Sequence, residues 1–172
     1  MPLPVLTTER LTLRPSTAAD TDRLWQLWIH PDVRRYMFDD RAMPREEAEA
    51  WILQQETFAA RGLGAWVIET PDGGFVGHIC LVDVHDLEPA YEGDVEFGIA
   101  LAPEAWGRGY AAEALRAVLA HGTGTAGLTR ILGIYDVPNL ASRKLQEEAG
   151  FVRLGETQGP VHRLVISAYS AA

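Results

Sequence analysis

The sequence of 172 residues has only one cysteine, Cys80, and no long hydrophobic run. A single cysteine excludes an internal disulfide and fits a reducing compartment, so we expect a cytoplasmic protein. No apolar stretch approaches the roughly 18 residues that a membrane-spanning helix needs. The residues at the start, Met-Pro-Leu-Pro, lack the basic and apolar segments of a secretory signal. The sequence therefore predicts neither a disulfide scaffold nor a membrane protein.

Positive charge is also scarce, with 15 Lys and Arg against 24 Asp and Glu and a formal net charge of −9. A protein that binds nucleic acid needs a basic face for the phosphates, so we expect no nucleic-acid partner. An acidic surface attracts a cationic substrate such as an amine. It also keeps a protein soluble, and both interpretations of the charge stay open.

The histidines and the cysteine show no spacing typical of metal ligands, so no metal is predicted. His78 and His85 are candidate bases, but His78 and Cys80 lie in an apolar run and are expected to pack in the core. The tryptophans are read as core residues, with one or two lining a substrate cleft (Trp25, Trp28, Trp51 and Trp66).

The chain has no repeat, low-complexity tract or linker, and residues 1–172 are read as one domain. Hydrophobic periodicity and turn residues predict a strand, two helices, three strands, a helix, a strand, a helix and two strands. The strands are expected at 6–14, 65–70, 75–84, 94–101, 131–135, 151–157 and 161–169. This order implies an α/β protein with a mixed sheet and helices on both faces.

Capping residues place the ends of the helices. Thr17 and Asp20 resemble a capping box for the first helix, and Pro44 suits the first position of the second. Gly150 is a natural left-handed residue after the last helix, with Phe151 folding back on Leu145. These signals fix the helices more closely than periodicity alone.

A glycine-rich turn at residues 106–112 (Trp-Gly-Arg-Gly-Tyr-Ala-Ala) lies between a predicted strand and a predicted helix. Gly107 and Gly109 allow positive φ and close approach of a ligand, and a helix start offers unpaired N–H groups. Together they suit an anion such as a diphosphate. The turn matches neither a Walker loop nor the three-glycine dinucleotide fingerprint. A turn that only redirects the chain is the alternative.

Three segments together resemble the GNAT acetyltransferases, in particular the branch of Rim-type ribosomal-protein N-terminal acetyltransferases. Residues 106–115 are similar to the pyrophosphate loop of that family. Residues 8–15 (Thr-Glu-Arg-Leu-Thr-Leu-Arg-Pro) are similar to the first strand of the branch. Residues 139–145 (Asn-Leu-Ala-Ser-Arg-Lys-Leu), followed by Gly150 and Phe151, are similar to its second CoA-contacting motif. Their order and spacing match the family along nearly the whole chain.

The resemblance implies the GNAT fold, a mostly antiparallel seven-stranded sheet with about four helices, and acetyl-CoA as co-substrate. Pantetheine would pair with the strand edge near Ile99 and Leu101 and contact Asn139, which is also a natural N-cap. The diphosphate would lie on the turn of Trp106, Gly107, Arg108, Gly109, Tyr110, Ala111 and Ala112. Arg108 either adds charge there or points into solvent.

The sequence departs from the family at Gln146, where many members place a tyrosine acid near the departing thiolate. A glutamine is a poor acid. Ser142 faces the same way one turn earlier, so it either hydrogen-bonds the thiolate or packs the helix. A thiolate with a pKa of about 8.5 is a fair leaving group without a dedicated acid.

Glu96 is the candidate base, because family members often carry a catalytic glutamate in this region. Asp94 lies on the same strand face, and like charge would raise one pKa of the pair. A surface pair, a direct role for Asp94 and a water relay are the alternatives. An acidic stretch without Lys or Arg surrounds them and would attract an amine, or forms a solvated loop (Asp83, Asp86, Glu88 and Glu92).

These residues predict an acyl-CoA-dependent N-acetyltransferase that acts by direct attack of a primary amine. The resemblance favours the α-amine of a protein N-terminus as acceptor, with a small-molecule amine as the other possibility. A non-catalytic acyl-CoA-binding or sensor domain is the alternative function, supported by Gln146 and opposed by Glu96. The sequence is compatible with either a homodimer or a monomer.

Overall fold

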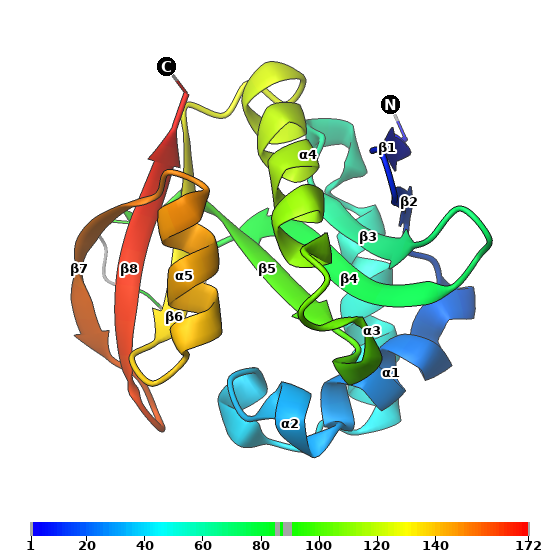
Figure 1. Cartoon of the computed structure of the whole chain (residues 1–172), viewed down its shortest axis with the longest axis horizontal. Coiled ribbons are helices and arrows are strands. Elements are labelled where there is room, and N and C mark those ends of the chain that lie inside the picture. The colour runs from blue at the N-terminus through cyan, green and yellow to red at the C-terminus, as the bar shows by residue number, and fades with distance from the viewer. Residues whose placement is uncertain (1, 85–86, 88–90, 172) are drawn as a thin grey trace.

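The computed structural model describes residues 2–84, 87 and 91–171, and its strands form one sheet (Figure 1). Within these residues the sheet has eight strands in the order β1-β2-β3-β4-β5-β6-β8-β7. Neighbours are antiparallel except β5 and β6, which are parallel. The strands are β1 (Leu6–Thr7), β2 (Thr12–Pro15), β3 (Gly64–Glu69), β4 (Phe75–Asp83), β5 (Val95–Leu101), β6 (Arg130–Asp136), β7 (Val152–Gln158) and β8 (Arg163–Ser170). The predicted mixed, mostly antiparallel sheet is confirmed.

Helices cover both faces of the sheet, with α4 and α5 in front of it and α3 behind it in Figure 1. The helices are α1 (Thr21–Ile29), α2 (Pro31–Arg34), α3 (Arg45–Glu56), α4 (Tyr110–Gly124) and α5 (Leu140–Glu148). No helix in the described part of the chain combines the length and the apolar character needed to cross a membrane.

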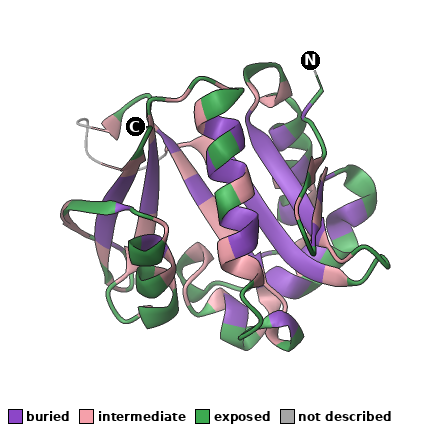
Figure 2. Ribbon diagram, turned by 45° about the horizontal axis from the view of Figure 1, so that its top comes forward, coloured by how far each residue is buried: buried purple, intermediate pink, exposed green. Residues whose placement is uncertain are grey.

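Strand β3 shows why both faces must be covered. Trp66 and Ile68 pack in the cluster with α4, whereas Val67 between them packs with α1 and α3. A strand with apolar residues on both faces reads as a continuous hydrophobic run and needs helices on each side. Figure 2 shows the result: the central strands are buried, and the exposed residues lie on the outer sides of the helices, on the loops and along the edge strand β7.

The predicted first strand at 6–14 is wrong, because the chain turns at residues 8–11 and forms the hairpin β1–β2. The Thr8 N–H donates to the Leu11 carbonyl at 2.9 Å, and the Thr8 hydroxyl donates to Glu113 of α4 at 2.6 Å. A contact with a helix more than 100 residues away thus fixes the turn. The sheet gains an eighth strand, where the sequence predicted seven.

The predicted helix ends are confirmed only in part. Thr17 N–H donates to Asp20 Oδ2 at 2.9 Å, although this box caps a short 3-10 turn that leads into α1. Pro44 is not the first helical residue: its ψ of 147° is extended, so it is the N-cap of α3. Gly150 has the expected positive φ of 90°, and the Phe151 N–H closes the end of α5 on the Gln146 carbonyl at 3.0 Å.

The sheet opens between β5 and β6. Their pairing is limited to Glu96 with Leu132 and Phe97 with Gly133. Beyond Phe97, β5 continues to Leu101 beside β4 alone. This opening places one edge of β5 at the site described next.

Candidate active site

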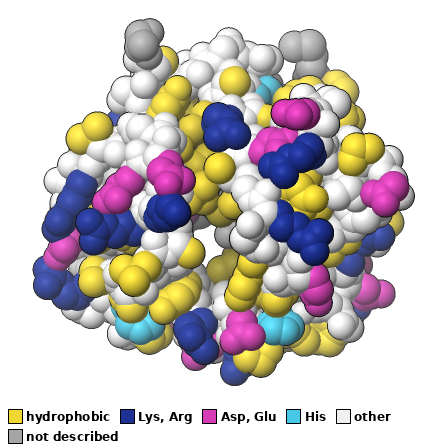
Figure 3. Space-filling model, viewed as in Figure 1, with side chains coloured by type: hydrophobic (Ala, Val, Ile, Leu, Met, Phe, Trp, Pro, Cys, Tyr) yellow, Lys and Arg dark blue, Asp and Glu magenta, His cyan; other side chains and the backbone are white. Residues whose placement is uncertain are grey.

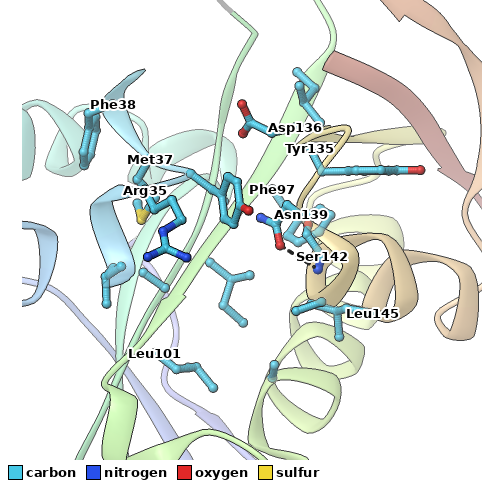
Figure 4. Close-up of a pocket in the computed structure, with 18 of the residues that line it drawn as sticks. Arg35, Met37, Phe38, Phe97, Leu101, Tyr135, Asp136, Asn139, Ser142 and Leu145 are labelled. Carbon is cyan, nitrogen blue, oxygen red and sulfur yellow. Dashed lines mark hydrogen bonds between the residues drawn. The ribbon is translucent and has the colours of Figure 1, made fainter. Parts of the chain in front are cut away.

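A cavity of about 1210 Å³ extends from the glycine turn at the start of α4, along the opening between β5 and β6, to the segment that follows α2. Figure 4 shows its walls, with Leu101 on one strand, Asn139, Ser142 and Leu145 on α5, and Arg35 and Met37 opposite. In Figure 3 this opening is a hollow between α4 and α5, with hydrophobic side chains along it and a mixture of basic and acidic side chains on both sides.

The glycine turn has the backbone that an anion site requires. Gly107 and Gly109 have φ of 73° and 79°, and Gly109 is the N-cap of α4. Within the described residues, no protein acceptor receives the N–H groups of Gly109, Tyr110 and Ala111. A Cβ added to Gly107 would meet no atom within 4 Å, so the turn is open to a ligand. These amides, at the positive end of the α4 dipole, can hold a phosphate.

Not every residue predicted for this turn faces the cavity. Trp106, Gly107, Gly109, Tyr110 and Ala111 line it, whereas Arg108 and Ala112 do not. The Arg108 side chain is exposed, and its carbonyl accepts a hydrogen bond from Arg10 Nη1 at 3.0 Å. The solvent-facing alternative for Arg108 is therefore the one that fits the geometry.

The edge of β5 offers unpaired backbone groups. Val84 N donates to Asp94 O, and Ala102 N donates to Val76 O, each at 2.9 Å. Hydrogen bonds alternate along an antiparallel ladder. The backbone N–H and C=O groups of the even-numbered residues of β5 therefore point to β4, and those of Ile99 and Leu101 point to the side of β6. Strand β6 no longer pairs at that height. The amides of Ile99 and Leu101 thus point into the cavity.

Trp106 occupies the end of this edge. Its side chain is 48% exposed, and its Nε1 donates to the Leu101 carbonyl at 2.9 Å. The carbonyl of Leu101 is therefore engaged, and its N–H is the group left for a ligand. Trp106 also joins the strand edge to the glycine turn.

Asn139 is the N-cap of α5, as predicted, and its side chain also has a donor group left for a ligand. Its Oδ1 accepts from the Ser142 N–H at 3.1 Å, the dashed line in Figure 4. Its side chain lines the cavity, and in the described part of the chain no hydrogen bond engages its amide NH₂ group. One side chain can therefore cap α5 and donate to a ligand.

Gln146 does not reach the cavity. It is 1% exposed, and its Oε1 accepts from the Ser167 hydroxyl at 2.5 Å. Its Nε2 donates to Ser142 Oγ at 3.3 Å, whereas Ser142 itself lines the cavity. Because Ser142 Oγ accepts from Gln146, its own hydroxyl proton is free to donate into the cavity.

Glu96 lines the same cavity from the start of β5. Burial raises the pKa of its carboxyl to about 7. The expected effect of Asp94 is wrong, because Asp94 forms an ion pair with Arg130 (Arg130 Nε to Asp94 Oδ1, 3.0 Å). Loss of solvent, and not like charge, thus sets the pKa of Glu96 near neutrality.

The acidic stretch is less free than its sequence suggests. Arg61 pairs with Asp83 at 2.7 Å, as Arg130 pairs with Asp94. Glu92 is exposed. Asp86, Glu88 and the candidate base His85 lie outside the described residues. A general attraction of amines by this stretch is therefore reduced by two arginines that are distant in sequence.

The far wall of the cavity is apolar and aromatic. His78 is buried, accepts from Trp28 Nε1 at 3.4 Å, and has its pKa lowered by burial to about 4. It is a packed neutral residue, as expected, and so is Cys80, whose thiol pKa is raised by burial to about 12. Trp51 lines the cavity as one of the predicted cleft tryptophans, and Trp28 and Trp66 are core residues.

Sequence reasoning missed the wall formed by Arg35, Tyr36, Met37 and Phe38, which line the cavity after α2. The chain leaves this wall through positive φ values from Phe38 to Asp40 (49°, 56° and 56°). Aspartate adopts this conformation more readily than most residues, but for a bulky residue such as Phe38 it is rare, so the sequence carries no signal for the start of this turn. In the described part of the chain, no group of three or more His, Cys, Asp or Glu side chains is arranged to hold a metal.

Comparisons with known proteins agree with this geometry. A family model described as an acetyltransferase (GNAT) domain matches residues 10–152. The uncharacterized N-acetyltransferase YoaA of Bacillus subtilis (strain 168) is 31% identical over 161 residues, which cover 88% of this chain and 85% of that protein.

Two solved structures are similar to the fold. A putative GnaT-family acetyltransferase from Bordetella pertussis has a TM-score of 0.84 at 24% identity, covering 97% of this chain and 99% of that one. RimL, a ribosomal L7/L12 alpha-N-protein acetyltransferase in complex with coenzyme A, has a TM-score of 0.78 at 17% identity, covering 97% and 98%. At these identities the two structures support the fold alone.

Proposed function

The chain belongs to the GNAT family of acetyltransferases, and from this premise we propose that it transfers acetyl from acetyl-CoA to the α-amine of a protein N-terminus, with Glu96 as base. The family and its N-acetyltransferase activity are the premise. The acceptor and the residues in their roles are the proposal.

The observation that carries the proposal is one continuous cavity. It joins the glycine turn, the open edge of β5 and the partly buried carboxyl of Glu96. A diphosphate site, a strand edge for an amide-bearing arm and a base thus lie in the order that transfer from a CoA thioester requires. A domain that only binds CoA has no need of a base with a pKa near 7.

The residues present fit acetyl-CoA, which GNAT proteins bind and which supplies the acetyl group as a thioester. The amides of Gly109, Tyr110 and Ala111 would hold the diphosphate. The amides of Ile99 and Leu101 would pair with the pantetheine arm as an added strand does. The NH₂ group of Asn139 is the remaining donor for that arm.

Glu96 would remove the proton from the attacking amine, directly or through water. An amine attacks only when neutral, and an α-amine with a pKa of about 7.7–8.0 loses its proton far more readily than a lysine near 10.4. A base with a pKa of about 7 is well matched to that acceptor. The similarity to RimL, an alpha-N-protein acetyltransferase, supports the same choice. A small-molecule amine is the second class of acceptor.

Ser142 and Asn139 are proposed to face the departing thiolate. The free hydroxyl proton of Ser142 can donate to it, and a thiolate with a pKa of about 8.5 needs no stronger acid. Because Gln146 is turned into the core, no proton donor replaces the tyrosine of other members at that position. The amides of β5 would stabilise the negative charge on the acetyl oxygen.

Glu96→Gln tests the catalytic part of the proposal. We expect the variant to bind CoA with unchanged affinity in calorimetry and to lose turnover by about 10²-fold or more, the usual effect of removing a general base. Wild-type protein that binds CoA but acetylates no amine would favour the sensor alternative. Turnover that is unchanged in the variant would remove Glu96 from the mechanism.

A matched pair of glycine variants tests the CoA site. Gly107 and Gly127 have φ of 73° and 69°, and a Cβ at either would meet no atom within 4 Å. Gly107→Ala and Gly127→Ala therefore carry a similar backbone strain of about 1 kcal/mol. Only Gly107→Ala should weaken CoA binding in calorimetry. Equal CoA affinities would place the diphosphate elsewhere.

The acceptor is tested with a panel of N-terminal peptides, their N-acetylated controls and small amines, followed by thiol release from acetyl-CoA. Peptides with a free α-amine should react fastest, with no reaction of lysine side chains near neutral pH. A small amine that reacts far faster than every peptide would replace the protein N-terminus as the acceptor.

A further inference from the structure

The turn of the hairpin β1–β2 is bound to the first turn of α4 through the carboxylate of Glu113. Glu113 Oε1 accepts from the Thr8 hydroxyl at 2.6 Å and from the Arg10 N–H at 2.8 Å. Its Oε2 accepts from Arg10 Nε at 2.8 Å, and Arg10 Nη2 completes the ion pair at 2.7 Å. Both oxygens of Glu113 are thus held by the turn between the two strands.

Arg10 also reaches the glycine turn itself. Its Nη1 donates to the Arg108 carbonyl at 3.0 Å, and its guanidinium lies over the Tyr110 ring at 4.9 Å from the centroid. A Cβ on Gly109 would come within 3.5 Å of Arg10 Nη2. Arg10 therefore contacts Arg108 and Tyr110 and lies beside Gly109 between them, without lining the cavity.

The charge of this contact is balanced inside the protein. Glu113 is only 8% exposed. Burial alone would raise the pKa of its carboxyl, but the hydrogen bonds from Thr8 and Arg10 outweigh burial and lower the pKa. Glu113 therefore carries a negative charge within one turn of the diphosphate site, and Arg10 neutralises it.

We propose that Arg10, anchored on Glu113, is a positioning residue for the diphosphate site: it holds the glycine turn so that the amides of Gly109, Tyr110 and Ala111 face the ligand. This inference rests on the proposed CoA site. Nε, Nη1 and Nη2 each engage a protein acceptor, which holds the guanidinium against the turn. Arg10 is also absent from the cavity lining, which supports an action through the backbone of the turn.

The experiment compares S-acetyl-pantetheine, which lacks the diphosphate, with acetyl-CoA as acetyl donor. Arg10→Ala should raise the KM for acetyl-CoA and the Kd for CoA by about tenfold, the usual effect of losing a charge-assisted contact, with kcat within about twofold. The KM for S-acetyl-pantetheine should stay within about twofold of the wild-type value. A general loss of structure would affect both donors equally.

Arg116→Ala is the matched control. Arg116 is exposed on α4 beside the same turn and lies with Arg10 and Glu113 along one small surface cleft. Arg116→Ala removes the same charge from the same face as Arg10→Ala. If Arg10 acts by holding the glycine turn and not through its charge alone, Arg116→Ala should leave the preference for acetyl-CoA unchanged. Arg10→Lys keeps the positive charge but loses the planar guanidinium with its several donors, so it should show the Arg10→Ala effect in weaker form. It serves as the test if Arg10→Ala fails to fold.

The outcomes separate this inference from the proposed function. If the wild type discriminates between the two donors and Arg10→Ala or Arg10→Lys discriminates equally well, the role of Arg10 is wrong and the CoA site stands. An equal loss in Arg116→Ala would reduce the effect to surface charge and overturn the positioning role. If the wild type itself shows no preference for acetyl-CoA, the diphosphate site is wrong and this inference fails with it.

Discussion

At the scale of single residues, the chemistry of the site depends on removing a carboxylate from water. Glu96 has no counter-charge among the described residues, and burial alone raises its pKa to about 7. Asp94, two residues away, is held by Arg130. Two carboxylates that look equivalent in the sequence are thus assigned different tasks by their surroundings.

The pH dependence of turnover follows from that pKa. Only the ionised carboxylate of Glu96 accepts a proton, so kcat/KM should rise with pH and bend near pH 7, besides the bend at about pH 8 that ionisation of an α-amine acceptor adds in every variant. The measurement is a pH–rate profile of wild type, Glu96→Gln and the control Asp94→Asn. Asp94→Asn should keep the bend, and Glu96→Gln should lose it together with the activity. A bend that follows Asp94 would reassign the base.

The same pKa makes the stability of the fold depend on pH. The carboxyl of Glu96 titrates near 4.5 when unfolded and near 7 when folded, so the folded state holds the proton more tightly. Tighter proton binding by Glu96 stabilises the folded state by on the order of 3 kcal/mol. This contribution to the free energy of unfolding is complete below pH 4.5 and is lost as pH rises through 7.

Glu96→Gln removes this titration. Between pH 4 and pH 8, the free energy of unfolding of the variant should therefore rise relative to that of the wild type. Urea unfolding of both proteins at the two pH values measures the difference, and all other groups cancel. A difference between the two proteins that does not change with pH would contradict the burial of Glu96.

Individual site residues were predictable to different degrees. Gly107, Gly109 and Asn139 carry conformational or capping signals that the sequence displays, and Glu96 was found through resemblance. The wall at Met37 and Phe38 was not predictable. Its backbone turns left-handed at Phe38, a bulky residue without the conformational freedom of glycine, and only the packed structure reveals such a conformation.

At the scale of elements, the N-terminus of α5 combines a structural and a functional task in one side chain. The Oδ1 atom of Asn139 caps the helix through the Ser142 N–H, and the NH₂ group faces the cavity. The two tasks use different atoms, so different substitutions separate them.

Asn139→Asp keeps the capping oxygen and removes the amide donor, whereas Asn139→Ala removes both. The free energy of unfolding of Asn139→Asp should lie within about 0.5 kcal/mol of the wild-type value, and that of Asn139→Ala should be lower by about 1 kcal/mol. Both should raise the KM for acetyl-CoA. Thermal unfolding and donor titrations measure these effects. A normal KM in Asn139→Asp would leave Asn139 as a cap only.

The elements themselves were largely predictable, because capping boxes, prolines and periodicity are local signals. The failures are at places where a distant contact decides. The turn at residues 8–11 breaks a strand-like pattern because Glu113 binds it from α4. No local rule in the sequence of residues 6–14 contains that information.

At the scale of the whole molecule, the fold is a sheet that is nearly divided in two. Strands β1–β5 form one part and β6, β8 and β7 the other, joined by two residue pairs between β5 and β6. Helices α4 and α5 flank the opening on one face (Figure 1). A ligand in the opening would therefore join the two parts where the sheet does not.

The order of elements and the mixed sheet followed from the sequence, but the opening did not. Ile99 and Leu101 are ordinary strand residues, and nothing in their pattern distinguishes a paired edge from an open one. The opening arises where β6 departs from β5 after Phe97. Such a departure is a property of the assembled sheet, so only the resemblance to a family, which implies a free strand edge near Ile99 and Leu101, pointed to it beforehand.

Hydrogen exchange would show whether CoA closes this opening. The N–H groups of Ile99 and Leu101 face the cavity, whereas those of Gly98 and Ala100, on the same strand, already bind β4. CoA should slow exchange at Ile99 and Leu101 strongly, by local pairing. At a CoA concentration of 100 Kd, Gly98 and Ala100 should gain at most the global stabilisation of about 2.7 kcal/mol. Equal protection at all four amides would mean that CoA stabilises the fold without pairing with β5, and the pantetheine arm would then lie elsewhere.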